Sequence, residues 1–159
     1  MVPTLNDDSK LVVETAKNSK KIQNHKTTTV PVEVEYWHVL PALRRSISTN
    51  LKKEGLKQKE IANILGITEA GVSQYLKGSR GGLTGENGKE IAIPEWLAKE
   101  IISSCKILMN EKIENNPFLK EMNRLLILIR ENPTDFLCKL HTEFGSAEEN
   151  CDICMPQTE

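Results

Sequence analysis

Apolar residues in the first half of the chain recur every three or four positions, which is the spacing of amphipathic helices. The first such stripe consists of Leu40, Leu43, Ile47 and Leu51. We expect its helix to begin at Pro41, where the missing N–H costs nothing, and to end at Gly55. Just before it, apolar and polar residues alternate from Val30 to Tyr36, a pattern that predicts a short strand or an extended lead-in.

A second pair of stripes runs from Gln58 to Leu76 and predicts two short helices joined by a tight turn. Their core positions are Ile61, Leu65, Ile67, Val72 and Tyr75. Ala62 is small where the two helices would cross, Gly66 can adopt the positive φ that ends a helix, and Thr68 is a good N-cap for the next one. This order is typical of a helix-turn-helix, whose second helix enters the DNA major groove. The alternative is an ordinary helical hairpin of a core.

Positions of this segment that the core does not use are candidates for contact with DNA. Gln74 could pair with adenine, Ser73 could meet a base or a phosphate, Ala70 could touch a thymine methyl, and Glu69 could accept from cytosine N4. Lys77 and other polar or basic residues suit phosphates. The full set of expected DNA-binding residues is Gln58, Lys59, Thr68, Glu69, Ala70, Ser73, Gln74, Lys77 and Arg80.

The same residues carry a family resemblance. VLPALRRSISTNL and LKQKEIANILGITEAGVSQYLKGSRG resemble the helix-turn-helix of lambda-repressor-type (Cro/C1, or XRE-like) proteins, and most closely that of small predicted archaeal transcriptional regulators. The resemblance covers Tyr36 to Gly82, about a third of the chain. It implies a bundle of four or five helices that binds operator DNA as a dimer, with Ser73 and Gln74 on the recognition helix.

The second half follows a glycine-rich connector at residues 78–88 and predicts three more helices. Pro94 opens one that reaches about Met109; Asn116 and Pro117 open another, to about Arg130; Asn132 and Pro133 open the last, to about Phe144. The run LLILIR in the middle helix is apolar enough to suggest burial against a second copy. We therefore expect an all-α protein, a lambda-repressor-like helix-turn-helix bundle plus a C-terminal helical segment, that forms a homodimer.

Composition divides the chain into three parts. Residues 1–30 are polar, with a short apolar cluster, and are expected to form a disordered arm or, alternatively, a basic arm on DNA phosphates. Residues 31–83 would be the DNA-binding domain and residues 84–159 the dimerisation and metal-binding region. The formal charges of these parts are +2, +3 and -6, which sum to the net charge of -1, so the basic part suits a polyanion. The longest apolar run is far too short for a membrane span and no signal peptide is recognisable, so we expect a cytoplasmic protein.

Four cysteines supply the remaining candidate chemistry, as ligands of an iron–sulfur cluster (4Fe–4S) or of zinc. They are Cys105, Cys138, Cys151 and Cys154. The spacing of Cys151 and Cys154 allows both thiolates to reach one metal from a turn, and their polar surroundings offer no core to bury them. Cys105 is equally well explained as a buried core thiol, and His141 as a solvent-facing residue rather than a ligand. Only one C-x-x-C is present, which favours a cluster slightly over a zinc ribbon.

These patterns favour a DNA-binding transcriptional regulator with a metal- or redox-sensing C-terminal half. The resemblance agrees, since the archaeal regulators often carry cysteine-rich C-terminal regions. A thiol redox protein that uses the C-x-x-C is a second possibility, although that motif normally opens a helix after a strand. A helix-turn-helix fold that serves only as a protein-interaction module is the third. We expect no enzymatic activity and no small-molecule substrate.

Overall fold

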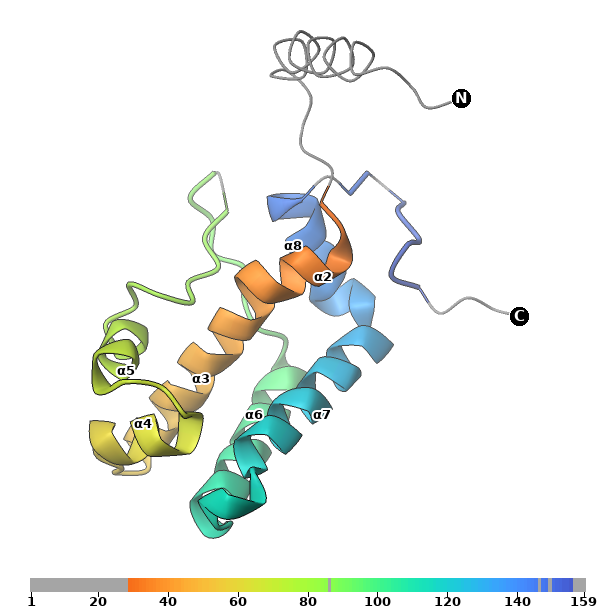
Figure 1. Cartoon of the computed structure of the whole chain (residues 1–159). Helices are drawn as coiled ribbons and strands as arrows, with labels where there is room; N and C mark the ends of the chain where they lie inside the picture. The colour runs from red at the N-terminus through yellow and green to blue at the C-terminus, as the bar shows by residue number, and fades with distance from the viewer. Residues whose placement is uncertain (1–28, 86, 146, 149, 156–159) are drawn as a thin grey trace, which may run out of the picture.

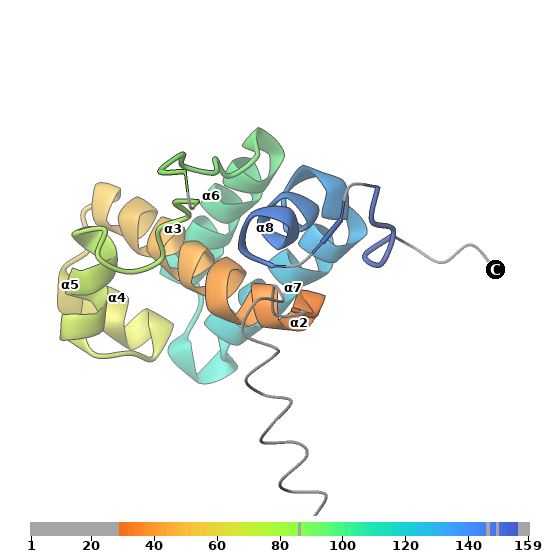
Figure 2. The same cartoon turned by 90° about the horizontal axis from the view of Figure 1, so that it is seen from above.

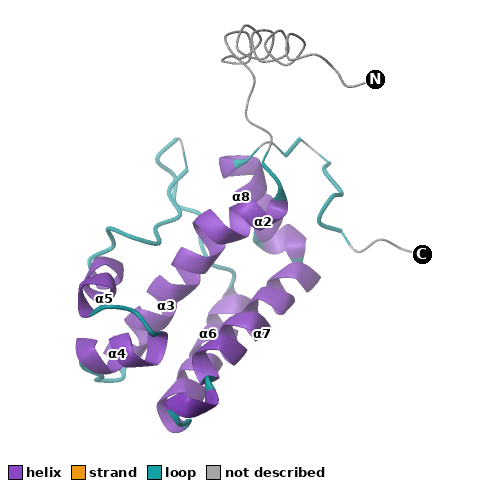
Figure 3. Cartoon of the chain, viewed as in Figure 1, coloured by secondary structure: helices purple, strands orange, loops and turns teal. Residues whose placement is uncertain are grey.

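The computed structural model describes residues 29–85, 87–145, 147, 148 and 150–155, and the expected N-terminal arm lies almost entirely outside this range. All regular elements in these residues are helices (Figure 3), which confirms the all-α class. The one β-type contact found there is an isolated antiparallel bridge between Thr84 and Glu90 in the glycine-rich connector. No helix in the described part of the chain combines the length and apolarity needed to cross a membrane.

The segment expected to be a strand is helical, so that prediction was wrong. α2 (Pro31–Val34) continues without a break through a π-helical turn, Glu35–Val39, into α3 (Leu40–Lys53). Its fully buried apolar side chains, at most 1% exposed, are Val34, Val39, Leu43, Ile47 and Leu51. The first interval is five residues and the others are four, which matches a π-turn followed by an α-helix. The alternation of valine and glutamate conceals this longer period.

Pro41 therefore lies inside a continuous helical segment and does not begin it. A proline removes one backbone donor, and its ring crowds the carbonyl four residues earlier, here that of Trp37. The wider π-turn lies next to this position, and the N–H of Leu40 donates to the carbonyl of Glu35. The extra residue in the turn thus accommodates the proline without ending the helix.

The next two helices form as their local signals predict. α4 (Gln58–Leu65) ends at Gly66, whose φ of 64° is left-handed, and α5 (Glu69–Leu76) begins after Thr68, whose hydroxyl accepts from the N–H of Gly71 at 3.1 Å. At the start of α4, the N–H of Lys57 donates to the carboxylate of Glu60 at 2.6 Å. Each end is satisfied by a local group, because the first N–H groups of a helix have no partner within it.

Three further α-helices follow, close to the expected positions. They are α6 (Glu95–Asn110), α7 (Pro117–Glu131) and α8 (Leu137–Phe144), with 3₁₀ turns at Ile113–Asn115 and Pro133–Asp135. The last helix was expected to begin at Pro133, but that proline opens only a 3₁₀ turn. The run LLILIR lies mainly inside the protomer, since Leu125 and Ile129 are fully buried and Ile127 is the one exposed apolar residue of the run.

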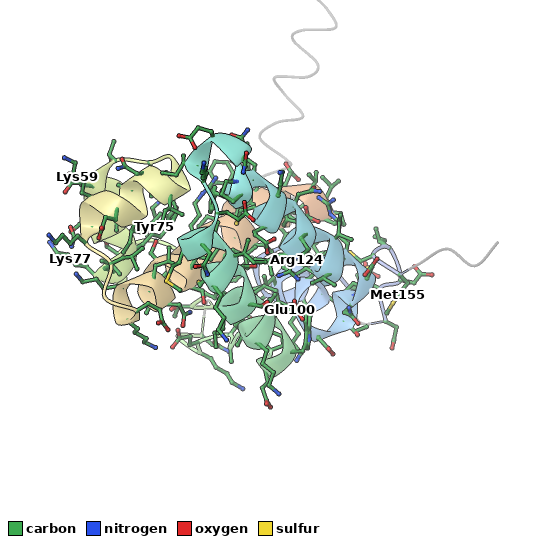
Figure 4. All side chains as sticks on the ribbon, turned by 90° about the horizontal axis from the view of Figure 1, so that it is seen from below. Lys59, Tyr75, Lys77, Glu100, Arg124 and Met155 are labelled. Atoms are coloured by element: carbon green, nitrogen blue, oxygen red, sulfur yellow. The ribbon has the colours of Figure 1, made fainter. Side chains whose placement is uncertain are left out.

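A single core connects both halves of the chain. α3 packs against α4 and α5 on one side and against α6 on another, α7 packs on α6, and α8 packs on α2. The α4–α5 pair thus lies at one end of the molecule and α8 at the other, in two perpendicular views (Figures 1 and 2). Arg124 of α7 donates to Glu121 of the same helix at 2.9 Å and, across to α6, to Ser104 at 2.9 Å, next to Glu100 (Figure 4). These bonds satisfy polar groups that the interface buries.

Candidate functional site

One face of α5 is fixed in the core and the opposite face points to solvent. Val72 and Tyr75 are fully buried against the other helices of the core. This orientation leaves five predicted positions outside, of which Ser73 is half-buried and the others are exposed: Glu69, Ala70, Ser73, Gln74 and Lys77. Because Val72 and Tyr75 fix the opposite face, α5 presents a row of mostly polar side chains to solvent along its length.

Gln74 is the residue in this row best suited to read a base. Its backbone carbonyl accepts from both the N–H and the hydroxyl of Ser79, at 3.1 Å each, which holds the chain just after α5. Its side-chain amide has no hydrogen-bond partner among the described residues. A side-chain amide offers one donor and one acceptor side by side, the pair that adenine presents in the major groove.

Basic side chains surround the outer end of this helix pair. Lys59 on α4 and Lys77 after α5 both project from the outer end of the molecule (Figure 4). The Arg80 guanidinium lies over the ring of Tyr75, 5.1 Å from its centroid, so its position is defined although the residue is exposed. Gln58, at the start of α4, is half-buried, and Thr68 is exposed while its hydroxyl serves as the N-cap.

Arg45 is a further cation here that the sequence did not single out. A Cβ built on Gly78 would lie 3.2 Å from Nη2 of Arg45, and one built on Gly82 would lie 3.5 Å from Nη1. The guanidinium of α3 therefore lies beneath the loop that leaves α5. The sequence places Arg44 and Arg45 off the apolar stripe, but only the path of the glycine-rich loop shows which of them faces this loop.

The structure does not bring all four cysteines together. Cys105 is buried in the core, where its thiol faces the carbonyl of Ile47 at 3.9 Å. Burial and the nearby carboxylate of Glu54 raise the pKa of this thiol to about 12. Burial is the main cause that raises the pKa of Cys154 to about 11, and the nearby carboxylate of Glu35 adds to the rise. Ile47 and Glu35 are roughly 18 Å apart along the helix at about 1.5 Å per residue, so Cys105 and Cys154 lie in different parts of the fold.

The other three cysteines gather at the α8 end. Cys138, in the first turn of α8, Cys151 and Cys154 lie close enough together to influence one another's pKa. Cys138 and Cys151 also line a pocket of about 420 Å³ between α8 and the C-terminal segment, together with His141, Thr134 and Met155. Cys154 is half-buried and packs against the core, contrary to the expectation that the polar tail offers its thiols no core.

His141 is buried, so its expected place in solvent was wrong. Its Nε2 lies 2.6 Å from the carbonyl of Thr29, and only 3% of the residue is exposed. The bond joins α8 to the chain just before α2. A second histidine, His38, stacks on Phe144 with ring centroids 4.0 Å apart, and burial lowers its pKa.

The cysteine cluster does not have the form of an assembled metal site. In the residues that the structure describes, no three His, Cys, Asp or Glu side chains are grouped so that they could hold one metal ion. Burial also raises the pKa of Cys138, and that of Cys154 to about 11, whereas metal ligands must be thiolates. The iron–sulfur or zinc centre stays a prediction.

Two regions of the surface thus stand out: the polar face of α5 with its surrounding cations, and the thiol cluster beside α8. Comparison with protein-family models, with curated proteins and with solved structures gives no match for this chain.

Proposed function

We propose that this chain is a sequence-specific DNA-binding protein and that α4 and α5 act as a helix-turn-helix. The observation that carries the proposal is the exposed polar row on α5, whose opposite face is anchored by Val72 and Tyr75. A helix with its side chains is about 10–12 Å across and the major groove about 12 Å wide. In this proposal α5 lies in the groove, and α4 crosses the backbone behind it.

Within this arrangement, the roles follow from the side chains. Gln74 reads a base with its amide, with Glu69, Ala70 and Ser73 beside it on α5. Phosphates are bound by a set of flanking residues, Lys59, Lys77, Arg80 and the half-buried Arg45. We further propose that two copies bind a site with two-fold symmetry, since helix-turn-helix proteins read half-sites about 34 Å apart and a second copy doubles the modest positive charge.

In the first step of the test, the full-length protein selects the sequences that it binds from a pool of random duplexes. Its affinity is then measured by titration for the enriched duplex and for a scrambled one. Gln74→Ala should weaken specific binding by about 1–3 kcal/mol and leave non-specific binding nearly unchanged. Asn123→Ala, which removes an exposed amide from α7, is the matched control and should change neither affinity.

Salt dependence separates the phosphate contacts from base reading. Lys77→Ala should weaken both duplexes alike and lower the slope of log K against log salt by about 1, because one fewer counterion is released. Lys120→Ala, an exposed lysine on α7, controls for the change of charge. The proposal fails if no duplex is enriched, which is the result expected of a protein-interaction module. It also fails if the Lys120 variant loses as much affinity as the Lys77 variant.

The thiol-enzyme alternative receives no support from the cysteine cluster. Attack on a disulfide or carbonyl needs a thiolate, and a catalytic cysteine therefore has a lowered pKa. Burial raises the pKa of Cys138 and of Cys154 instead.

A further inference from the structure

The first helical segment, from α2 through the π-turn, is apolar on two opposite faces. Val34 and Val39 lie five residues apart and point into the core. Val32 and Trp37 repeat this interval on the outer face, where they are 61% and 67% exposed. A helix that is apolar all round is normally covered on all sides. The described residues cover only the inner face of this segment.

The outer face presents two aromatic rings in contact with each other. Tyr36 is 61% exposed, and its ring meets that of Trp37 edge to face, with centroids 4.8 Å apart. Val32 lies about one turn earlier in the segment, and the N-cap residue Val30 is 48% exposed. α2 itself lies at the edge of the helix bundle (Figure 2). We call these four residues, Val30, Val32, Tyr36 and Trp37, the aromatic patch.

We propose that the aromatic patch is the contact surface between two copies of this chain, related by a two-fold axis. The sequence predicts a dimer from the run LLILIR, but the fold buries most of that run and exposes the patch. The inference deepens the proposed function and rests on it only for the use of the dimer at a two-fold DNA site. Self-association is measured without DNA, so either proposal can fail alone.

The charges around the patch favour a second copy over a strongly acidic or basic partner. Glu33 lies on the same outer face, and Arg130 borders it through its two bonds to Glu35, at 2.8 and 2.6 Å. Nη1 of Arg130 and one carboxylate oxygen of Glu33 have no partner in the part of the chain that the structure describes. A surface that carries both an acid and a base complements itself, because a two-fold axis can set each Glu33 against Arg130 of the other copy.

The size of the patch is sufficient for a dimer of moderate affinity. A covered aromatic side chain buries about 150–250 Å², so the exposed parts of Tyr36 and Trp37 amount to about 250 Å², and the two valines raise the total to about 400 Å². Two copies would bury about 800 Å² of apolar surface, or about 1,300 Å² in all if about 60% of the interface is apolar. This area is near the lower limit of about 1,200 Å² for stable interfaces. Tyrosine and tryptophan are also the residues most enriched at the centres of such contacts.

The first test follows the sedimentation velocity of the full-length protein across the micromolar concentration range. The wild type should change from monomer to dimer as its concentration rises. Trp37→Glu should weaken the dimer at least about tenfold, because it places an unpaired charge at the centre of the contact. Leu119→Glu is the matched control, since Leu119 of α7 is 65% exposed, and it should change the dissociation constant less than about twofold. Circular dichroism should show that both variants keep the fold.

Tryptophan fluorescence provides a second test that needs no disruptive variant. Trp37→Phe keeps an aromatic ring in the patch and leaves Trp96 as the only tryptophan. As the wild type is concentrated, its emission should move to shorter wavelengths and its quenching by acrylamide should fall, because Trp37 leaves water. Trp37→Phe should still form the dimer and show neither change.

Three results would overturn the inference. A dimer that survives Trp37→Glu, or that Leu119→Glu weakens as much, would place the interface elsewhere. An emission of Trp37 that does not change on dimer formation would do the same. A protein that stays monomeric at all concentrations would exclude the second copy: Trp37 shielded from acrylamide in that monomer would indicate residues 1–28 as the cover, and Trp37 open to acrylamide would indicate a different protein.

Discussion

Gly81 shows how closely the connector after α5 approaches α3. Its φ is +77°, and a Cβ at this position would meet the backbone carbonyl of Pro41 as well as the Cβ of Arg45, at 2.9 Å. Gly88 has a similar φ of +75° but open space around it. The two glycines share one conformational requirement and differ in the close contact, so they can be compared directly.

We expect Gly81→Ala to lower the free energy of unfolding by about 2–4 kcal/mol, and Gly88→Ala by only about 1–2 kcal/mol, because the first adds a backbone clash to the cost of a left-handed alanine. Urea unfolding followed by far-UV circular dichroism measures both. Equal losses would mean that the loop moves away from Pro41 at no cost.

His38 makes stability depend on pH. Burial lowers its pKa below the ordinary value of 6.5, so at mildly acidic pH the unfolded chain binds a proton that the folded chain excludes. The stabilisation by neutral His38 is therefore complete above about pH 6.5 and is lost as pH falls through the lower folded pKa.

Replacing His38 by phenylalanine keeps a ring stacked on Phe144 and removes the titration. On lowering the pH from about 7.5 to about 5, the free energy of unfolding of the wild type should fall more than that of His38→Phe. His141 is present in both proteins and cancels in the comparison. Parallel curves for the two proteins would exclude His38 as the source.

Sequence reasoning succeeded at residues whose role is local. Gly66 and Thr68 adopt the predicted C-cap and N-cap conformations, because caps depend on a few neighbouring residues. It failed for His141 and Cys154, since their burial depends on contacts with residues 29 and 138, which are distant in the sequence.

Among the elements, α5 depends on the residue that precedes it, the N-cap Thr68. It has eight residues, too few to be stable in isolation, and its first turn is satisfied by the hydroxyl of Thr68. Thr68→Ala should cost about 1 kcal/mol of unfolding free energy. Thr142→Ala provides the control, because Thr142 is an exposed threonine inside α8 whose hydroxyl only donates back to the carbonyl of Cys138 at 2.9 Å. This substitution should leave the free energy of unfolding nearly unchanged. Equal effects would show that the cap adds nothing.

Element boundaries could be predicted for α6 and α7, where proline and asparagine begin clean apolar stripes. The part of the first helical segment before Pro41 was missed because a π-turn has no simple sequence period, and the intervals of two in Val30 to Tyr36 suit a strand better than a helix. The outward-facing row on α5 could be predicted, because its residues are the positions of the helix that are left once the core positions have been assigned.

At the scale of the whole molecule, the shared core predicts cooperative unfolding. α3 contacts both the α4–α5 pair and α6, so neither the segment 31–83 nor the segment 84–159 can open without exposing apolar surface of the other. Unfolding followed by circular dichroism and by tryptophan emission should give coincident midpoints. A separate early transition in either signal would instead support two independent domains with a boundary near residue 83.

The positions of the two tryptophans provide an optical reporter for one end of the molecule. Trp37 is 67% exposed beside Tyr36 in the π-turn, and the indole of Trp96 donates to Asp135, just before α8, at 3.2 Å. Both indoles belong to the elements around α8, and α5 has no tryptophan. The tryptophan fluorescence of the native protein should therefore change when the thiols beside α8 react and stay constant when a ligand binds to α5. A single fluorescence measurement can thus distinguish events at the two ends of the molecule without an added dye.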